Sequence, residues 1–126
     1  MSEAWRTYGG YLAIAFAIAV FALRFVHALR VRRRIPELMR AGAQLVDVRS
    51  AGEFAAGHVA GSRNIPIAEI DRRADELDKN RWVILCCASG TRSGMALGKL
   101  RRRGFAQVLN GGSWRNFRTP PAGPRA

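Results

Sequence analysis

The N-terminal part of the chain is too apolar to belong to a small water-soluble domain. No charged residue occurs from Gly9 to Leu23, and the apolar character continues to Leu29 with Arg24 as its one charged member. About 20 mostly apolar residues are needed to cross the hydrocarbon core of a bilayer. The rest of the 126-residue chain is too short to surround a helix that is apolar on every face. We therefore predict one transmembrane helix within residues 1–34.

The charges beside this stretch argue against a cleaved signal peptide and predict an orientation. A signal peptide carries its positive charge before the apolar region and a small-residue cleavage site after it. Here the basic cluster follows the apolar region, at Arg30, Arg32, Arg33 and Arg34. Basic residues close to a span favour the cytoplasmic side. We expect a single-pass protein of the cell (inner) membrane, with the N-terminus outside and the following domain in the cytoplasm.

Charge and cysteine content narrow the possible partners. The formal net charge is +12, but the juxtamembrane arginines account for much of the excess and have a role against anionic lipid. The remaining dense basic patch, residues 99–105, is typical of a solvated helix face, so we expect no nucleic-acid partner. Cys86 and Cys87 are neighbours, which strains a disulfide and leaves too few ligands for a structural metal site. We predict free thiols and no metal.

Beyond the basic cluster the sequence alternates between strand and helix patterns. Short apolar runs predict three strands, and the second run is apolar throughout, as in parallel sheets covered on both faces. These runs lie at 45–48, 82–87 and 107–110. Helical patterns that alternate with them lie at 36–42, 67–77 and 93–104. Together they predict a small three-layer α/β domain with a mainly parallel central sheet over 35–118, then a disordered tail over 119–126.

The stretch VILCCASGTRSGM, residues 83–95, has the composition of a loop that holds an anion. It follows the predicted central strand, and α/β sheets place their ligand sites at the carboxyl ends of strands. The four residues after Cys87 are small, so their backbone N–H groups can turn inward at the N-terminus of the next helix and stabilise a thiolate or an oxyanion. We expect Arg92 to bind an oxyanion or to fix the loop, and Ser93 to cap the helix.

A structural interpretation of the same residues stays open. A free cysteine is among the most buried residue types, and its usual role is inert packing. Glycine-containing loops also join strands to helices in α/β proteins that have no catalytic role there. His58 lies in a glycine-rich turn, where a structural role is favoured over that of a base for the cysteine. His27, within the apolar span, is expected to be incidental.

Three segments, in this order, resemble the rhodanese family of sulfurtransferases. They are LVDVRSAGEFAAGHVAGSRNIP at 45–66, similar to the family's first signature, CASGTRS at 87–93, similar to its active loop, and LNGGSWRNF at 109–117, similar to its closing segment. The resemblance covers about 36–118. It implies the small α/β fold just described. It also implies transfer of a sulfane sulfur from thiosulfate or another donor to a nucleophilic acceptor through a cysteine persulfide, without a metal or organic cofactor.

The resemblance assigns roles to particular residues. Cys87 is the expected nucleophile that carries the persulfide. The loop expected to cradle it consists of Ala88, Ser89, Gly90, Thr91, Arg92 and Ser93. Four further matches are expected to hold the fold and the surroundings of the loop together, namely Asp47, Arg49, Glu53 and His58. The resemblance implies a small sulfur donor, either thiosulfate or a persulfide, and a thiol or cyanide-like acceptor. The apolar span separately predicts the membrane, and a membrane protein, as partners.

The chain departs from the family's pattern, and its adjacent cysteines leave alternatives open. Ala88 stands where the family often has arginine, which removes a charge that would help to recruit thiosulfate. Counted to Arg92, Cys86 gives the C-x5-R spacing of rhodanese-fold phosphatases and arsenate reductases, so an enzyme of that class is one alternative. A non-catalytic sulfur-binding or scaffold module is another. Side chains alternate along a strand, so only one of Cys86 and Cys87 can face the site.

Overall fold

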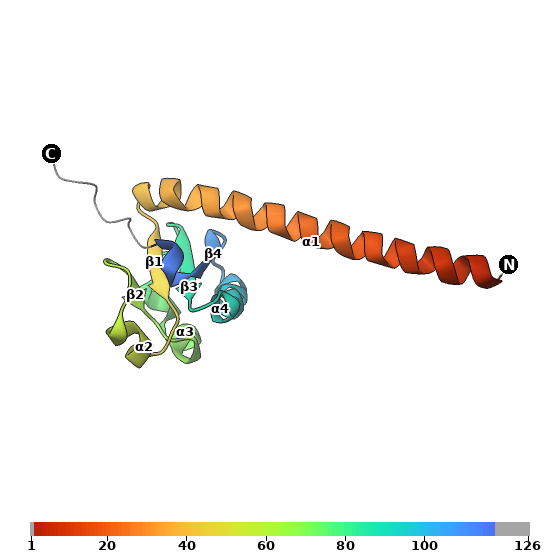
Figure 1. Ribbon diagram of the computed structural model, residues 1–126. Helices are drawn as coiled ribbons and strands as arrows, with labels where there is room; N and C mark the ends of the chain where they lie inside the picture. The colour runs from red at the N-terminus through yellow and green to blue at the C-terminus, as the bar shows by residue number, and fades with distance from the viewer. Residues whose placement is uncertain (1, 118–126) are drawn as a thin grey trace. The chain divides into compact units, whose positions relative to one another are not determined.

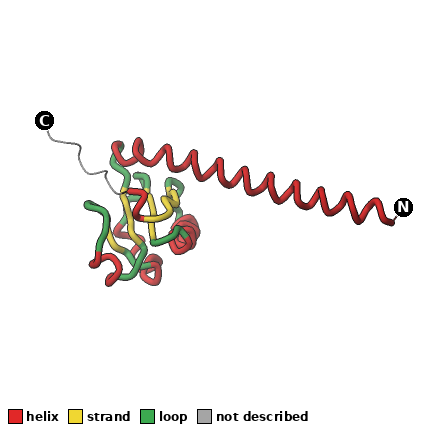
Figure 2. Tube along the Cα trace, in the orientation of Figure 1, coloured by secondary structure: helices red, strands yellow, loops and turns green. Residues whose placement is uncertain are grey.

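The computed structural model describes residues 2–117, and its contacts divide the chain after Arg34. All the strands belong to the unit that begins at Ile35. The tail predicted for 119–126 lies outside the described residues. Figure 2 follows the helices, strands and loops along the chain. In order, the elements are α1 (Ser2–Arg40), β1 (Gln44–Asp47), α2 (Ala51–Ala56), β2 (Arg63–Asn64), the 3-10 helix η1 (Ile67–Glu69), α3 (Ile70–Arg73), the 3-10 helix η2 (Ala74–Glu76), β3 (Val83–Cys87), α4 (Thr91–Arg102), β4 (Val108–Ser113) and the 3-10 helix η3 (Trp114–Phe117).

Four parallel strands form the sheet, in the order β2, β1, β3 and β4 (Figure 1). All five residues of β3 are buried, because β1 and β4 lie on its two sides and helices cover both its faces. This is the environment that an apolar strand without polar alternation needs. The fold predicted from the sequence, a small α/β domain with a parallel sheet preceded by one long apolar helix, is confirmed.

Alternate side chains of β3 enter two different cores. On one face, Ile84 and Cys86 pack with side chains of β1 and the last turns of α1, whose buried members are Leu45, Ile35 and Leu38. On the other face, Val83, Leu85 and Cys87 join side chains of α3 and α4, among them Ile70, Ala96 and Leu100. The sheet therefore separates the side chains of Cys86 and Cys87, as the alternation of strand residues requires.

The N-terminal helix contains Pro36, the residue at which the sequence pattern predicts the start of a short helix. The structure shows that prediction to be wrong, because α1 continues through Pro36 to Arg40. A proline removes one backbone donor from a helix, which raises its energy without always ending it. Here Ile35 and Leu38 are buried on either side of Pro36, and their packing stabilises this turn in the helical conformation.

Two other helix predictions also need correction. The segment predicted as one helix from 67 to 77 is broken into η1, α3 and η2. The helix predicted over 93–104 is α4, which begins at Thr91 because Gly90 adopts a left-handed conformation at its N-cap. The buried residues of α4 are Ser93, Ala96 and Leu100, whereas the side chain of Met95 is 58% exposed.

The side chains of α1 before Arg34 are unlike those of the α/β unit. An 18-residue window of this helix has a mean hydropathy of 2.2 and is not buried inside the structure. The large apolar side chains from Trp5 to Leu29 are exposed, several of them by more than 60%. By length and composition the helix can cross a membrane, although a signal sequence near an N-terminus would have the same properties.

Candidate active site

The loop that carries the candidate site is short and depends on close backbone packing. It joins the end of β3 at Cys87 to the start of α4 at Thr91. Gly90 has a φ of 97°, and a Cβ placed on it would lie 3.2 Å from the Cα of Gly112 at the end of β4. A side chain at Gly90 would therefore meet both backbone strain and a steric contact. This glycine lets the loop close over the carboxyl end of the sheet.

The thiol of Cys87 is surrounded by neutral hydrogen-bond donors. The backbone N–H of Gly90 donates to Sγ at 2.9 Å, and the Ser93 hydroxyl oxygen lies 3.5 Å from Sγ. Burial raises the pKa of the Cys87 thiol, but the side chain of Ser93 and the backbone N–H groups of Ser93, Ser89 and Gly90 lower it, and the net shift is downward. A thiol whose pKa is lowered is more often a thiolate, which is the nucleophilic form.

The neighbouring thiol has the opposite electrostatic environment. Cys86 lies in the core between the sheet and the end of α1, without the loop donors that surround Cys87. Burial, followed by the negative charge of Asp47, raises the pKa of Cys86 to about 12. At neutral pH this thiol stays protonated and behaves as a small apolar side chain.

Ser93 and Asn110 connect the loop to β4. Ser93 was expected to be the helix cap, but it lies inside the first turn of α4, is fully buried and donates its hydroxyl to Oδ1 of Asn110 at 2.7 Å. Asn110 also accepts from the N–H of Gly112 at 2.9 Å and donates to the carbonyl of Gly90 at 3.0 Å. No role for Asn110 is predicted from the sequence. The feature that could have indicated one is its position at the end of a predicted strand, where the site residues of α/β sheets lie.

The guanidinium of Arg92 is already paired in the structure. It donates to both carboxylate oxygens of Glu53, at 2.7 and 3.0 Å. The Arg92 hydrogen bonds are the main reason that the pKa of Glu53 falls to about 2, and the same pair raises the pKa of Arg92. Glu53 also completes a capping box with Ser50 at the start of α2. The Arg92–Glu53 pair therefore joins the first turn of α4 to α2.

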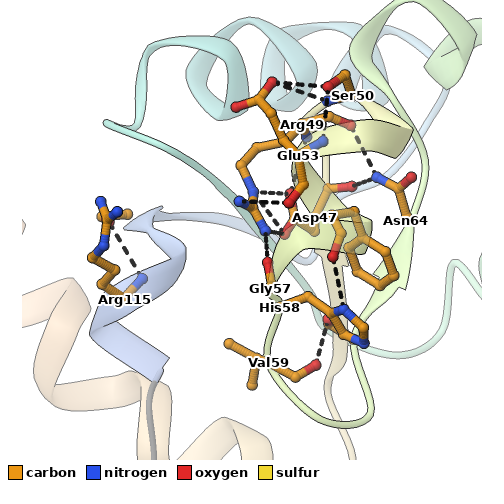
Figure 3. Close-up of polar contacts among 12 residues, drawn as sticks. Asp47, Arg49, Ser50, Glu53, Gly57, His58, Val59, Asn64 and Arg115 are labelled. Atoms are coloured by element: carbon orange, nitrogen blue, oxygen red, sulfur yellow. Dashed lines mark hydrogen bonds and ion pairs between the residues drawn. The ribbon is translucent and has the colours of Figure 1, made fainter.

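A buried ion pair lies at the carboxyl end of the neighbouring strand β1 (Figure 3). Arg49 binds Asp47 with an N–O distance of 2.7 Å, and both side chains are at most 5% exposed. The guanidinium also donates to the carbonyl of Gly57 at 2.7 Å and lies 4.5 Å from the ring centroid of Trp114. Asn64 donates to the carbonyls of Asp47 and Arg49. With these hydrogen bonds the two buried charges are compensated, as a stable interior requires.

The histidines have no contact with the Cys87 loop among the interactions of the described residues. His58 is exposed, stacks on Phe54 with ring centroids 3.8 Å apart, and has Nδ1 2.9 Å from the Phe54 carbonyl (Figure 3). His27 lies on α1. Within residues 2–117 there is no group of three or more His, Cys, Asp or Glu side chains that could hold a metal ion. The groups that the loop brings together are the Cys87 thiol and its hydrogen-bond partners.

Comparison with known proteins identifies the family of the α/β unit. Residues 33–117 match the model of the rhodanese-like domain. Uncharacterized protein YqhL of Bacillus subtilis is 38% identical over 100 residues, which cover 76% of this chain and 79% of that protein. Thiosulfate sulfurtransferase GlpE of Pseudomonas aeruginosa is 32% identical over 87 residues, which cover 66% of this chain and 79% of that protein.

A solved structure gives the same result at the level of the fold. The structure described as rhodanese with anions from E. coli superposes with a TM-score of 0.58 and 33% sequence identity, over 63% of this chain and 95% of that one. The matched segment contains all four strands, the Cys87 loop and the Asp47–Arg49 pair. The chain therefore belongs to the rhodanese-like domain family, and its relatives in that family include thiosulfate sulfurtransferases.

Proposed function

We propose that the protein is a sulfurtransferase in which Cys87 accepts a sulfane sulfur, holds it as a persulfide and passes it to a thiol or cyanide-like acceptor. The observation that carries the proposal is the hydrogen-bonded cradle around Sγ of Cys87 at the carboxyl end of the central strand. Backbone N–H groups at the start of a twelve-residue helix favour a negative charge on sulfur. The thiosulfate sulfurtransferases among the relatives support the same reaction class.

The reaction consists of two sulfur–sulfur exchanges. In the first, the Cys87 thiolate attacks the outer sulfur of the donor, so that a bond forms from Sγ to that sulfur while the donor's own sulfur–sulfur bond breaks. With thiosulfate the leaving group is sulfite. In the second, the acceptor attacks the outer sulfur and releases the Cys87 thiolate, so that cyanide becomes thiocyanate. Both steps conserve charge and need no external electrons.

The surrounding residues hold the loop rather than carry electrons or protons. The Gly90 N–H stabilises the thiolate and, after the first step, the persulfide. The Ser93 hydroxyl has one proton, and it supports the negative sulfur by turning that proton from Asn110 Oδ1 to Sγ. Asn110 makes one hydrogen bond each with Ser93, Gly90 and Gly112, and so orients the first two. The Arg92–Glu53 pair fixes α2 against the helix that follows the loop. This division of roles leaves Cys87 as the group that forms and breaks covalent bonds.

We also place the enzyme at a membrane, with residues 1–34 as a single-pass anchor and 35–118 as the rhodanese-like domain. The support is the exposed apolar surface of α1 and the arginine cluster that follows it. The cluster favours a cytoplasmic position for the α/β unit, with the N-terminus outside. This position would deliver sulfur close to a membrane-protein partner.

Mass spectrometry of the full chain in detergent micelles tests the proposal. The protein is incubated with thiosulfate or with cysteine persulfide, and the peptide that contains both cysteines is examined for one additional sulfur atom. We expect the sulfur in the wild type and in Cys86→Ala, and none in Cys87→Ala. A cyanide or thiol acceptor should remove it and form thiocyanate or a new persulfide.

Other results would reject the proposal and indicate a different class. Sulfur that remains on Cys86 in the Cys87→Ala variant would identify the wrong thiol. Hydrolysis of an aryl phosphate that is lost in Cys86→Ala would indicate the phosphatase-like spacing. Absence of sulfur on the wild type with both donors would leave a non-catalytic module.

A further inference from the structure

The charged side chains closest to the Cys87 loop cancel one another in pairs. Arg92 is neutralised by a bidentate pair with Glu53, and Arg49 by the buried pair with Asp47. The side chains that follow Cys87 at the loop surface, Ala88, Ser89 and Thr91, are exposed and uncharged. Beside these paired and uncharged side chains, the Cys87 thiolate carries a charge that none of them balances.

Among the residues that the structure describes, two further arginines lie far from the loop. Arg101 and Arg102 are at the opposite end of α4 from the loop, about 15 Å along the helix at 1.5 Å per residue. That exceeds the Debye length of about 8 Å at physiological ionic strength, so their attraction for an anion at Cys87 is screened. Arg115 is exposed, and its guanidinium lies 5.4 Å from the centroid of the Trp114 ring. Arg115 is therefore one of the residues that we substitute in the salt experiment.

Hydrogen bonds from neutral groups stabilise Sγ of Cys87. The Gly90 N–H and the Ser93 hydroxyl can stabilise a single negative charge on sulfur. They supply no full positive charge for a second and third negative charge beside it. Thiosulfate is a dianion, so its approach to the thiolate brings three negative charges into a site whose side-chain charges already cancel. A donor whose reacting group has at most one negative charge avoids most of this repulsion.

We infer that the sulfur donor of this site is a persulfide of a thiol rather than thiosulfate. The inference rests on the proposed function and names the donor class within it. The Cys87 thiolate attacks the outer sulfur of R–S–SH, the bond from Sγ to that sulfur forms, and the donor's sulfur–sulfur bond breaks. The products are the Cys87 persulfide, which keeps the proton, and the thiolate R–S⁻. Atoms, electrons and charge balance without a further reactant.

The first test is the effect of salt on the rate at which Cys87 of the full chain in micelles gains sulfur. Like charges repel less when salt screens them, so loading of the wild type from thiosulfate should accelerate as the salt concentration rises. Loading from cysteine persulfide should change much less. Thiosulfate loading that slows with salt would show that a net positive site attracts the dianion, and it would overturn the inference. If that slowing disappears in Arg115→Gln, Arg115 is the group responsible.

The second test adds a charge at the loop surface. Ala88→Arg places a positive charge on an exposed position, and a unit charge about 7 Å from a dianion changes its local concentration by about fivefold to tenfold in water. The ratio of the thiosulfate to the persulfide rate constant should rise by that factor and lose the gain at high salt. Ala88→Gln, which is long but neutral, should leave the ratio within about twofold of the wild type.

A third variant removes a negative charge that is already part of the site. Glu53→Gln keeps the length of the side chain that caps α2 but leaves the charge of Arg92 uncompensated, so it should shift the same ratio in the same direction. If neither Ala88→Arg nor Glu53→Gln changes the ratio, charge does not select the donor and the inference fails. If Cys87 gains no sulfur from either donor, the proposed function itself fails, which is a different result.

Discussion

At the scale of single residues, hydrogen-bonding groups without a net charge lower the pKa of Cys87. The sequence predicts that Arg92, five residues after Cys87, binds an oxyanion or fixes the loop. The structure pairs that arginine with Glu53, and the groups that lower the pKa of Cys87 are the Ser93 side chain and three backbone N–H groups. Ser93 is the one side chain among these groups, so its removal directly tests how the pKa of Cys87 is lowered.

Ser93→Ala should move the ionisation of Cys87 to higher pH. The lowered pKa means that the thiolate forms at a lower pH than in an ordinary cysteine, and losing the hydroxyl removes part of that shift. The rate of Cys87 alkylation by iodoacetamide should rise with pH in both proteins, with a higher midpoint in the variant. The measurement uses the Cys86→Ala background, so that one thiol reacts.

Ser89→Ala is the matched control for this measurement. Ser89 affects Cys87 through its backbone N–H, while its hydroxyl lies 3.3 Å from that of Thr91. The alanine variant keeps the N–H, so its midpoint should stay at the wild-type value. Equal midpoints in Ser93→Ala and the wild type would contradict the role assigned to the Ser93 hydroxyl.

At the scale of elements, β4 holds the loop in place through an irregularity in its pairing. Leu85 lies opposite Asn110, but Cys87 lies opposite Ser113, so β4 has one residue more than β3 in this interval. Such a bulge bends the strand and redirects its side chains. A Cβ on Gly111, in the bulge, would lie 2.4 Å from a ring atom of Phe117 in η3. The glycine pair thus allows β4, the loop and η3 to pack closely.

Gly111→Ala should destabilise the protein by about 1–3 kcal/mol, because the added methyl group displaces the Phe117 ring from a packed core. Thermal unfolding followed by circular dichroism would show a lower midpoint. The matched substitution Gly98→Ala lies within α4, where an added Cβ meets nothing within 4 Å. It should raise stability by about 0.5–1 kcal/mol through helix propensity. The prediction for Gly111 fails if both variants shift the midpoint in the same direction.

At the scale of the whole molecule, the two units differ in how exposed their apolar side chains are. The α/β unit surrounds its apolar side chains with helices on both faces of the sheet. The large apolar side chains of α1 before Arg34 are exposed in the isolated chain. Each such side chain gains about 1.5–3 kcal/mol when it leaves water, and this gain is the physical basis of the proposed membrane anchor.

The proposed anchor predicts that the full chain stays with the membrane fraction after washing with high salt and with alkaline carbonate. A protein held only by its arginine cluster would be released by salt. Intact-mass measurement of the membrane-bound protein should find the N-terminal residues present, whereas a cleaved signal peptide would leave them missing. Either release by salt or loss of the N-terminal segment would reject the anchor.

A double substitution provides the control. Ile14→Arg with Ile18→Arg places two charges near the middle of the apolar segment, and each charged side chain costs about 2.5–3.5 kcal/mol on insertion scales. The variant should lose its retention in carbonate while its α/β unit, which contains neither residue, keeps its ability to load Cys87. Loss of both properties together would show that the two units depend on each other.

Much of the architecture followed from local sequence because the responsible forces are local. The continuous apolar run of β3 requires burial on both faces, and the alternation of its side chains separates the two cysteines whatever the rest of the fold does. The uncharged segment from Gly9 to Leu23 similarly defines a helix that a soluble domain of this size could not bury. The motifs at 45–66, 87–93 and 109–117 supplied the family.

Other features were decided by contacts between residues far apart in the chain. Arg92 meets Glu53 across 39 residues, Ser93 meets Asn110 across 17, and Pro36 stays helical because its neighbours are buried against the sheet. A sequence pattern states which groups can form hydrogen bonds or ion pairs but not which partner each one finds. The sequence by itself therefore determined three of the four strands, the apolar helix and the place of Cys87 at the end of the central strand. The tertiary structure decided that Arg92 is neutralised and that neutral dipoles stabilise the thiolate, because pairing of charges depends on distance in space.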